Sequence, residues 1–252
     1  MLLVGPAASA SGAANVRFVN AVPGAGAVQL QGIEGGITQK VGGRAGFADV
    51  GGYADVPSGN VRFELGGEGE GASARTRLRN RAHYTVVALP GGGGARLEVL
   101  RDGRAQPGAA RLRVLHAAPE LGSVEVDLGE RALADGVGFG DVSGYTTVEP
   151  GAYALNVVNP ENGSALAARG GVAITAGTSS TAFVVGSGGE PVQVVVAAER
   201  TAAPRGAPAT GLGGLADEDP RLMLALMAGL LAALAGGGAY LALTARSRRG
   251  DS

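Results

Sequence analysis

The stretch Arg111-Leu-Arg-Val-Leu-His-Ala-Ala-Pro119 decides the fold, because a version of it occurs twice in the chain. The earlier version, Val16-Arg-Phe-Val-Asn-Ala-Val-Pro23, is followed by Asp49-Val-Gly-Gly-Tyr53, and the later one by Asp141-Val-Ser-Gly-Tyr145. The second tyrosine lies 92 positions after the first (145 − 53). Self-similarity over this distance indicates two copies of one domain. We therefore expect two domains, 15–103 and 110–200, within the 252 residues.

Both copies have the alternation that is typical of β-strands with one buried face. Val28-Gln-Leu-Gln31 and Val61-Arg-Phe-Glu-Leu65 alternate apolar and polar residues, and Gly- and Pro-containing turns separate such segments. The loops Pro90–Gly94 and Gly186–Gly189 each lie between two apolar strands, as in a hairpin. No sustained helical period occurs before Pro220. The sequence predicts two tandem immunoglobulin-like antiparallel β-sandwiches.

Composition excludes several classes of function. Cysteine is absent, which excludes disulfides, zinc–thiolate sites and thiol nucleophiles. The net charge of −1 gives no general attraction for nucleic acid, so we expect no nucleic-acid partner. We also expect no cofactor and no resident metal.

The two ends of the chain indicate export and anchoring. Residues 1–14 resemble the end of a signal peptide, with Ala8-Ser-Ala10 as the small-residue cleavage pattern; the alternative is an N-terminus without fixed structure. Residues 201–220 are rich in Pro and Gly, as in a flexible linker. Within 221–244, the uncharged run Leu222–Leu243 is long enough to span a bilayer. The basic tail 245–252 predicts a single pass with a cytoplasmic C-terminus and both sandwiches outside the cell.

A group of motifs in the second copy resembles a known bacterial family. The motifs are Arg113-Val-Leu-His-Ala-Ala-Pro119, Val124-Glu-Val-Asp127, the Phe139–Tyr145 turn and Pro150-Gly-x-Tyr153. Together they resemble the domain of unknown function 4397. The resemblance implies extracellular β-sandwich modules, often in tandem on a surface anchor, and no established activity. The chain departs from the family pattern in having Ala118 for a serine, Glu120 for an aspartate, and Asn20 where the second copy has its histidine.

His116 is the most obvious candidate for chemistry, and we interpret it as structural. A catalytic or metal-binding histidine needs partner groups, and the repeat gives His83 no counterpart. Asn20 occupies the position of His116 in the first copy, and asparagine can replace the hydrogen bonds of histidine but not its acid–base chemistry. Pro23 and Pro119 occupy equivalent positions and close the same motif.

Two carboxylate patterns allow a functional reading and a structural one. Asp49 and Asp141 precede Gly52-Tyr and Gly144-Tyr, so they either bind calcium or, as we expect, fix a turn through backbone amides. Glu125 and Asp127 share one strand face, but the first copy has glutamines at these places, as on a solvated face.

Tyr53 and Tyr145 recur at the same place in both copies. We interpret them as tyrosine corners, in which the hydroxyl binds loop backbone; the alternative is that they stack on sugars. Taken together, these patterns predict a membrane-anchored bacterial surface protein that binds a cell-wall polymer or another surface protein, with lipid contacted through the C-terminal helix. A spacer without any ligand is the alternative. We do not expect an enzyme, because the candidate residues do not assemble a catalytic constellation.

Overall fold

The computed structural model describes residues 12–66, 71–104, 107–187 and 189–201. They belong to one compact unit, Met1–Arg205. The expected membrane-spanning segment, its basic tail, the linker beyond Thr201 and the signal-like residues before Gly12 lie outside the described residues. In the part of the chain that the structure covers, no helix has the length and apolarity needed to cross a membrane.

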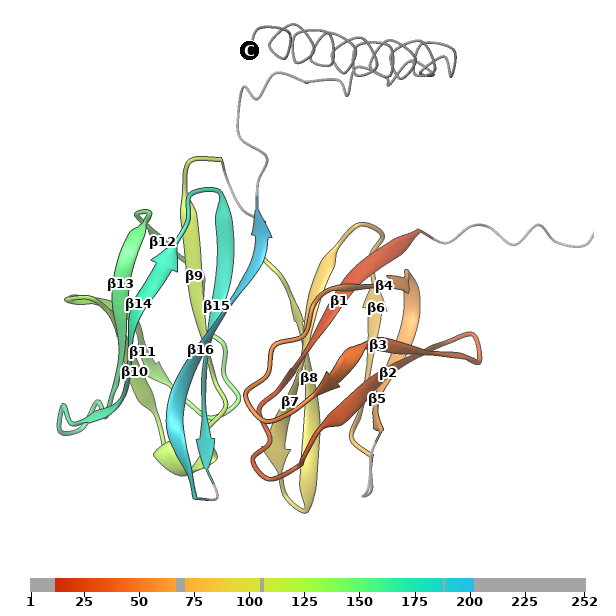
Figure 1. Cartoon of the computed structure of the whole chain (residues 1–252), viewed down its shortest axis with the longest axis horizontal. Coiled ribbons are helices and arrows are strands. Elements are labelled where there is room, and N and C mark those ends of the chain that lie inside the picture. The colour runs from red at the N-terminus through yellow and green to blue at the C-terminus, as the bar shows by residue number, and fades with distance from the viewer. Residues whose placement is uncertain (1–11, 67–70, 105–106, 188, 202–252) are drawn as a thin grey trace, which may run out of the picture. The chain divides into compact units, whose positions relative to one another are not determined.

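The first copy contains eight strands among its described residues and forms two sheets (Figure 1). One sheet has the order β4-β1-β7-β8 and the other has the order β3-β2-β5-β6. The strands are β1 (Ala13–Asn20), β2 (Val28–Glu34), β3 (Ile37–Ala45), β4 (Ala54–Pro57), β5 (Gly59–Gly66), β6 (Ser73–Leu78), β7 (His83–Gly91) and β8 (Gly94–Arg101).

The second copy repeats this arrangement strand for strand. Its sheets have the orders β12-β9-β15-β16 and β11-β10-β13-β14. The elements are β9 (Ala110–His116), the short 3₁₀ helix η1 (Pro119–Leu121), β10 (Val124–Leu128), β11 (Arg131–Val137), β12 (Thr146–Val148), β13 (Gly151–Val158), β14 (Ala165–Ile174), β15 (Thr178–Ser187) and β16 (Glu190–Thr201). The predicted all-β architecture of two sandwich units is therefore confirmed.

The expected purely antiparallel pairing is wrong in one place per copy. β1 runs parallel to β7, from the pair Asn15 and His83 to the pair Asn20 and Ala88. β9 and β15 pair in the same way. Each central strand is antiparallel to one neighbour, β4 or β12, and parallel to the other. Apolar alternation predicts which face of a strand is buried, but it carries no information on the direction of the neighbouring strand.

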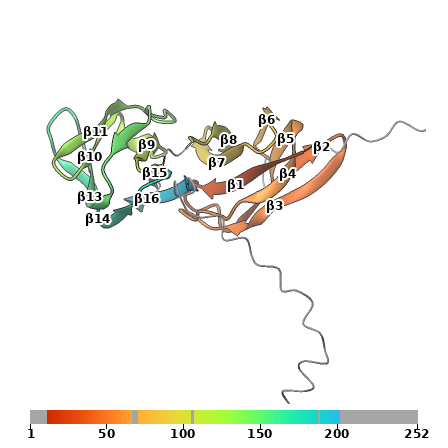
Figure 2. The same ribbon diagram turned by 90° about the horizontal axis from the view of Figure 1, so that it is seen from above.

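The predicted immunoglobulin-like connectivity is also wrong. An immunoglobulin constant domain places its first, second, fourth and fifth strands in one sheet. Here the first strand lies with the fourth, seventh and eighth, whereas the second pairs with the third and fifth. The expected hairpins around Pro90–Gly94 and Gly186–Gly189 are present as β7–β8 and β15–β16. Figure 2 shows β7 and β8 side by side from above.

Each sandwich has its own apolar core between its two sheets. In the first copy, Phe63, Leu30 and Val16 are completely buried among the side chains of both sheets. In the second copy, Leu155 and Leu112 lie in the corresponding core. Valine, leucine and alanine make up most of both cores, as expected from the low aromatic content.

A third apolar cluster joins the two copies. Because β7 and β15 are buried on both faces, the side chains that point away from their own cores lie in this cluster; they include Val87 and Phe183, each 0% exposed. We call this cluster the seam; its buried members are Val19, Ala21, Val87, Leu89, Leu100, Leu115, Ala117, Phe183, Val185 and Ala197. The two copies keep separate sheets but share this buried layer.

The seam is built from equivalent positions of the two copies. Val19 and Leu115 are 96 positions apart (115 − 19), and so are Val87 and Phe183 (183 − 87). An interface in which each partner contributes the same surface has the two-fold character of a homodimer. The tandem repeat therefore reproduces, within one chain, a dimer-like interface.

Candidate anion-binding site

Asn20 and His116, predicted to be structural equivalents, make matching hydrogen bonds. Both are completely buried. The main-chain nitrogen two residues later donates to each side chain, Val22 N to Asn20 Oδ1 at 3.0 Å and Ala118 N to His116 Nδ1 at 3.2 Å. Each side chain then reaches the carbonyl six residues later, Asn20 Nδ2 to Gly26 O at 3.5 Å and His116 Nε2 to Gly122 O at 2.9 Å.

These contacts give His116 the role of a loop clamp. Accepting at Nδ1 and donating from Nε2 requires the neutral ring with its proton on Nε2. Burial lowers the pKa of His116, which favours the same neutral form. Among the described residues, no three His, Asp or Glu side chains gather as a metal site would require.

Asp49 and Asp141 lie at the turns that the sequence assigned to them. Asp49 Oδ2 accepts a hydrogen bond from Gly46 N at 2.8 Å. The main-chain nitrogen of Asp141 donates to Gly138 O at 2.9 Å. A Cβ on Gly138 would lie 2.8 Å from the carboxylate of Asp141, so a larger residue there would require that side chain to move. The carboxylate of Asp49 therefore fixes its turn through a backbone amide as predicted, and Asp141 lies in an equivalent turn closed by its main-chain nitrogen.

The remaining predicted motif residues have ordinary structural surroundings. Pro119 begins η1, and Pro23 lies in the turn after β1. A Cβ on Gly52 or Gly144 would meet nothing within 4 Å, so close packing does not explain glycine there.

The Tyr145 hydroxyl contacts loop backbone as expected of a tyrosine corner, accepting a hydrogen bond from Gly103 N at 2.8 Å, whereas the Tyr53 hydroxyl binds a side chain instead. Their hydroxyls bind buried carboxylates, Tyr53 Oη to Asp102 Oδ2 at 2.5 Å and Tyr145 Oη to Glu199 Oε2. Burial raises the pKa of both phenols, which therefore keep their protons and donate. Both tyrosines are half-buried, with an arginine guanidinium over each ring. The sequence placed these residues at equivalent positions but could not show that their partners lie near the seam.

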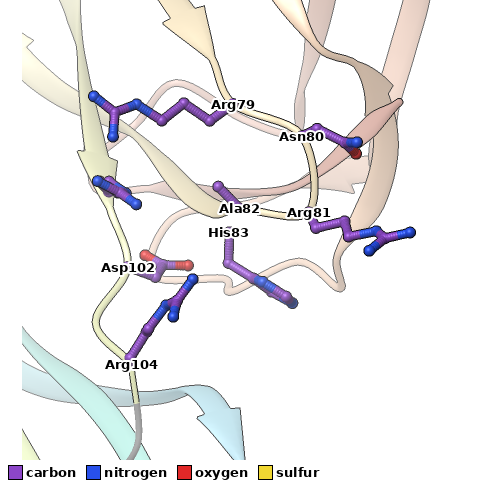
Figure 3. A pocket seen from close by; sticks show the side chains of 8 residues that line it. Arg79, Asn80, Arg81, Ala82, His83, Asp102 and Arg104 are labelled. Carbon is purple, nitrogen blue, oxygen red and sulfur yellow. The ribbon is translucent and has the colours of Figure 1, made fainter. Parts of the chain in front are cut away.

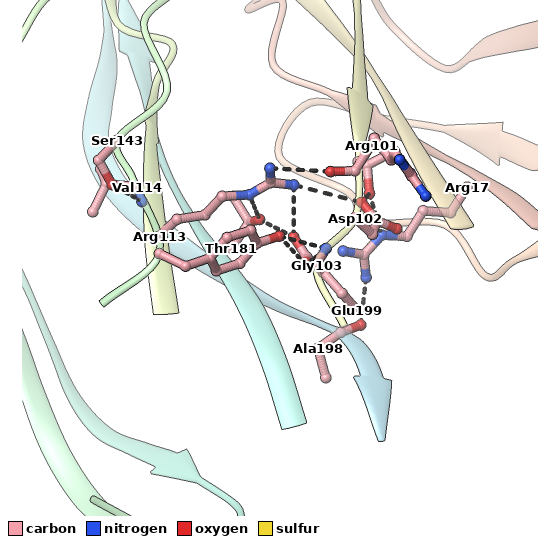
Figure 4. Close-up of polar contacts among 12 residues, drawn as sticks. Arg17, Arg101, Asp102, Gly103, Arg113, Val114, Ser143, Thr181, Ala198 and Glu199 are labelled. Carbon is pink, nitrogen blue, oxygen red and sulfur yellow. Dashed lines mark hydrogen bonds and ion pairs between the residues drawn. The ribbon is translucent and has the colours of Figure 1, made fainter. Parts of the chain in front are cut away.

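The carboxylates belong to a polar network that occurs once in each copy (Figure 4). In the first copy, Arg17 Nε donates to Thr85 Oγ1 at 2.9 Å, and Thr85 donates to Asp102 Oδ1 at 2.8 Å. In the second copy, Arg113 Nε donates to Thr181 Oγ1 at 2.8 Å, and Thr181 donates to Glu199.

The two networks contact each other across the seam. Arg113 Nη2 lies 2.8 Å from Glu199 Oε1 in its own copy and 3.5 Å from Asp102 Oδ1 in the other. The side chains of both acids are fully buried and that of Arg113 is 8% exposed. Burial, and then the nearby charge of Glu199, raises the pKa of Asp102. Two buried arginines, Arg17 and Arg113, thus lie beside two buried carboxylates.

The sequence carries a signal for this network in its repeated polar residues. Arg17 and Arg113 are 96 positions apart, as are Thr85 and Thr181, so the repeat retains both. Strands β7 and β15 also contain continuous apolar runs, Val86–Leu89 and Ala182–Val185, rather than alternation, which indicates burial on both faces.

A basic pocket of about 530 Å³ lies at one end of the first copy (Figure 3). Arg79 and Arg81 come from the turn between β6 and β7, while Arg101 and Arg104 come from the end of β8 and the residues after it. All four arginines are exposed. Asn80, Ala82, His83 and Asp102 complete the lining.

The pocket has an excess of positive charge. Asp102 is the only carboxylate among the described residues that line it, and it already accepts hydrogen bonds from Tyr53 and Thr85. The ion pairs found within the described residues do not include any of the four arginines. Guanidinium groups bind carboxylate or phosphate through paired, charge-assisted hydrogen bonds, so an anion that enters this pocket meets several cationic donors. We call this feature the arginine pocket.

Comparison with solved structures gives low-scoring similarities. A structure from Bacteroides uniformis, described as a proposed cell adhesion protein, has 13% identity and a TM-score of 0.23, covering 75% of this chain and 98% of the other. A proposed adhesin from Bacteroides ovatus has 9% identity and a TM-score of 0.18, with coverage of 76% and 95%. A proposed cell adhesion protein from Bacteroides fragilis has 11% identity and a TM-score of 0.17, with coverage of 75% and 98%. At these scores the likeness carries no argument about fold or function.

No curated protein matches the chain. A family model does match, twice, over residues 14–127 and 110–210. The two segments correspond to the two copies, and the first extends into the beginning of the second. The match covers well over half of the chain. The chain therefore belongs to the family of the domain of unknown function DUF4397.

Proposed function

We propose that this protein is a bacterial surface protein whose two-domain head binds an anionic partner in the arginine pocket. The observation that carries the proposal is that Arg79, Arg81, Arg101 and Arg104 line one pocket and have no ion-pair partners among the described residues. Maintaining like charges close together costs free energy, which a bound anion offsets. The partner in this proposal is a cell-wall polymer or another surface protein, and the head acts as a binder rather than as an enzyme.

The seam supports a role in which the protein holds a bound partner at a fixed position or under mechanical load. Two domains that share a buried apolar layer and a buried ion network move as one body, whereas domains on a flexible linker move independently. A ligand held at the first copy is then at a fixed distance from the C-terminal end of the second. In this proposal, Leu222–Leu243 anchors the head to the membrane, with the C-terminus in the cytoplasm.

The same seam is compatible with a second function, that of a spacer without a ligand. Two sandwiches joined by the seam would hold a fixed length between their ends, whether or not they also present a binding site. The two functions differ in whether the arginine pocket is needed.

A pull-down of purified cell-wall material with the full chain in detergent separates the two functions. We expect the parent chain to retain anionic wall polymer and the variant Arg79→Gln/Arg101→Gln to lose most of it. The matched control is Arg44→Gln/Arg131→Gln, which removes two exposed arginines elsewhere and should bind like the parent. Equal retention by both variants, or none by the parent, would favour the spacer.

A further inference from the structure

A row of arginines, Arg75, Arg77 and Arg79, leads along the sheet edge to the arginine pocket; we call it the ladder. Arginines occupy every second position of Arg75-Thr-Arg-Leu-Arg-Asn-Arg81. β6 covers Ser73–Leu78 and is the edge strand of its sheet, paired only with β5. Alternation places Arg75 and Arg77 on one face, both exposed, while Leu78 is buried. Arg79 and Arg81 follow in the turn and line the pocket.

The ladder has a regular spacing. Residues two apart on a strand are separated by roughly 6.8 Å, since each residue advances the chain by about 3.4 Å. Arg75, Arg77 and Arg79 therefore present three cations over roughly 14 Å where the strand geometry continues. A small anion can contact one or two of these guanidiniums, whereas a linear chain with an anion in each unit can contact all of them.

Among the described residues, which do not include 67–70, the arginines of the ladder have no ion-pair partner. The ion pair between described residues of this sheet joins Arg62 to Glu64 at 2.8 Å and does not include Arg75, Arg77 or Arg79. Arg62 lies directly opposite Arg75 across β5 and β6. Like charges at opposed positions destabilise a sheet; Glu64 offsets the charge of Arg62, while Arg75 has no carboxylate partner among the described residues.

Protection of the sheet edge does not account for the ladder. Charged residues on an edge strand do prevent pairing with other chains. β14 is the equivalent edge strand of the second copy, and its one arginine, Arg169, donates to Val194 O at 2.8 Å. The second copy therefore has the equivalent edge strand without a row of arginines, and the ladder is specific to the first copy.

The net charge is also more positive in the first copy, which carries the ladder, than in the second. Residues 12–103 carry 10 basic and 8 acidic side chains, a net charge of +2 (10 − 8). Residues 110–200 carry 5 basic and 10 acidic side chains, a net charge of −5 (5 − 10). An anionic chain is therefore attracted to the first copy and repelled by the second.

We infer that the ladder and the arginine pocket form one continuous binding track for a linear polyanion, a polymer with a phosphodiester or carboxylate in each unit. This inference rests on the proposed function and specifies its ligand class. Arg75 and Arg77 hold the polymer along β6, and the pocket holds its end or a bend in it. Guanidinium forms paired hydrogen bonds with either kind of anion, so the track accepts both.

The test measures affinity as a function of ligand length. Poly(glycerol phosphate) and polygalacturonate chains of one to twelve units are titrated into the full chain in detergent. Affinity should increase from one to about four units, as additional charges reach the ladder, and then level off. The comparison of the two polymers decides between phosphodiester and carboxylate as the preferred anion.

Two variants separate the track from the pocket. Arg75→Gln/Arg77→Gln should weaken binding of the long chains about ten-fold, leave the single units unchanged, and make the dependence of log K on log salt shallower by about 1.4. Arg44→Gln/Arg131→Gln is the control and should change neither. If affinity does not depend on ligand length, or if Arg75→Gln/Arg77→Gln behaves like the control, the inference of a continuous binding track is wrong. The proposal that the arginine pocket binds an anion is unaffected by that result. If Arg79→Gln/Arg101→Gln binds single units as the parent does, the proposed function itself fails.

Discussion

Arg17 and Arg113 occupy the same position in the two copies, and each donates a hydrogen bond to the main chain of the opposite copy. Arg17 Nη1 lies 2.6 Å from Ala198 O, and Arg113 Nη1 lies 3.3 Å from Arg101 O. Ala198 and Arg101 are themselves equivalent, each preceding the buried acid of its copy. The exchange is reciprocal, as across a two-fold axis. The copies are therefore joined by a specific interface and not only by the chain that connects them.

Removing the Arg113 guanidinium should destabilise the head strongly. In Arg113→Met, the buried carboxylates of Glu199 and Asp102 lose the cation that lies between them. Breaking a buried pair from one side costs about 3–5 kcal/mol, because the remaining charge cannot be hydrated. Chemical denaturation of the full chain measures this loss. Arg111→Gln is the control, since Arg111 lies over Tyr145 but makes no buried ion pair, and a loss for Arg113→Met no larger than the control's would contradict the account.

The seam should make the two copies unfold together. Phe183 is fully buried in the seam, so Phe183→Ala should cost about 3–5 kcal/mol and weaken the coupling between the copies. Calorimetry of the parent should give one transition for the head, whereas Phe183→Asp should broaden or split it. Two separate transitions in the parent would show that the seam does not couple the copies.

Much of this architecture could be predicted from the sequence. The repeat predicted two copies of one sandwich, and the alternation in Val28–Gln31 and Val61–Leu65 predicted strands with the observed buried faces. The parallel pairing of β1 with β7 could not be predicted, because side-chain alternation is the same for both pairing directions. The first strand also begins earlier than expected, at Ala13.

The candidate site was harder to predict, for a physical reason. Asn20 and His116 bind the equivalent buried backbone groups of their two copies. Aligning the two copies of the repeat places these two residues at the same position. The arginine pocket instead combines Arg79 and Arg81 with Arg101 and Arg104, which are some twenty positions away in the chain. Their meeting depends on the β7–β8 hairpin returning to the β6–β7 turn. The ladder alone was visible in the sequence, as arginine at every second position.

His116→Asn should change the pH dependence of stability while keeping the clamp. The folded-state pKa of His116 is lowered, so the unfolded chain binds more protons than the native one when the pH falls through about 6.5. The unfolding free energy of the parent therefore decreases as the pH drops from 7.5 to 5.5. The asparagine variant lacks this decrease and should be within about 1 kcal/mol of the parent at pH 7.5, because Asn20 makes the same bonds.

The difference in unfolding free energy between variant and parent at each pH isolates this effect, since Asp102 and the other titrating groups are common to both. His116→Ala is the control and should be less stable at every pH, since Ala118 N and Gly122 O lose their partner. A pH profile of His116→Asn that parallels the parent's would contradict the prediction.

Calcium should not stabilise the head. Asp49 Oδ2 already binds the turn amide of Gly46, and the geometry gives Asp141 the same kind of turn. Melting temperatures of the full chain in calcium and in chelator should agree, because a ligand that does not bind the native state cannot stabilise it. An increase in melting temperature that saturates with calcium and disappears in Asp49→Asn or Asp141→Asn would restore the calcium reading.

Occupation of the arginine pocket is the central claim, and NMR of the arginine side chains tests it most directly. The Nε–Hε signals of the full chain in detergent are followed during titration with poly(glycerol phosphate). We expect the signals of Arg79, Arg81, Arg101 and Arg104 to shift together and saturate, while Arg131 in the second copy does not move. Saturable shifts confined to other arginines, or no shifts at concentrations that saturate wall binding, would contradict the claim.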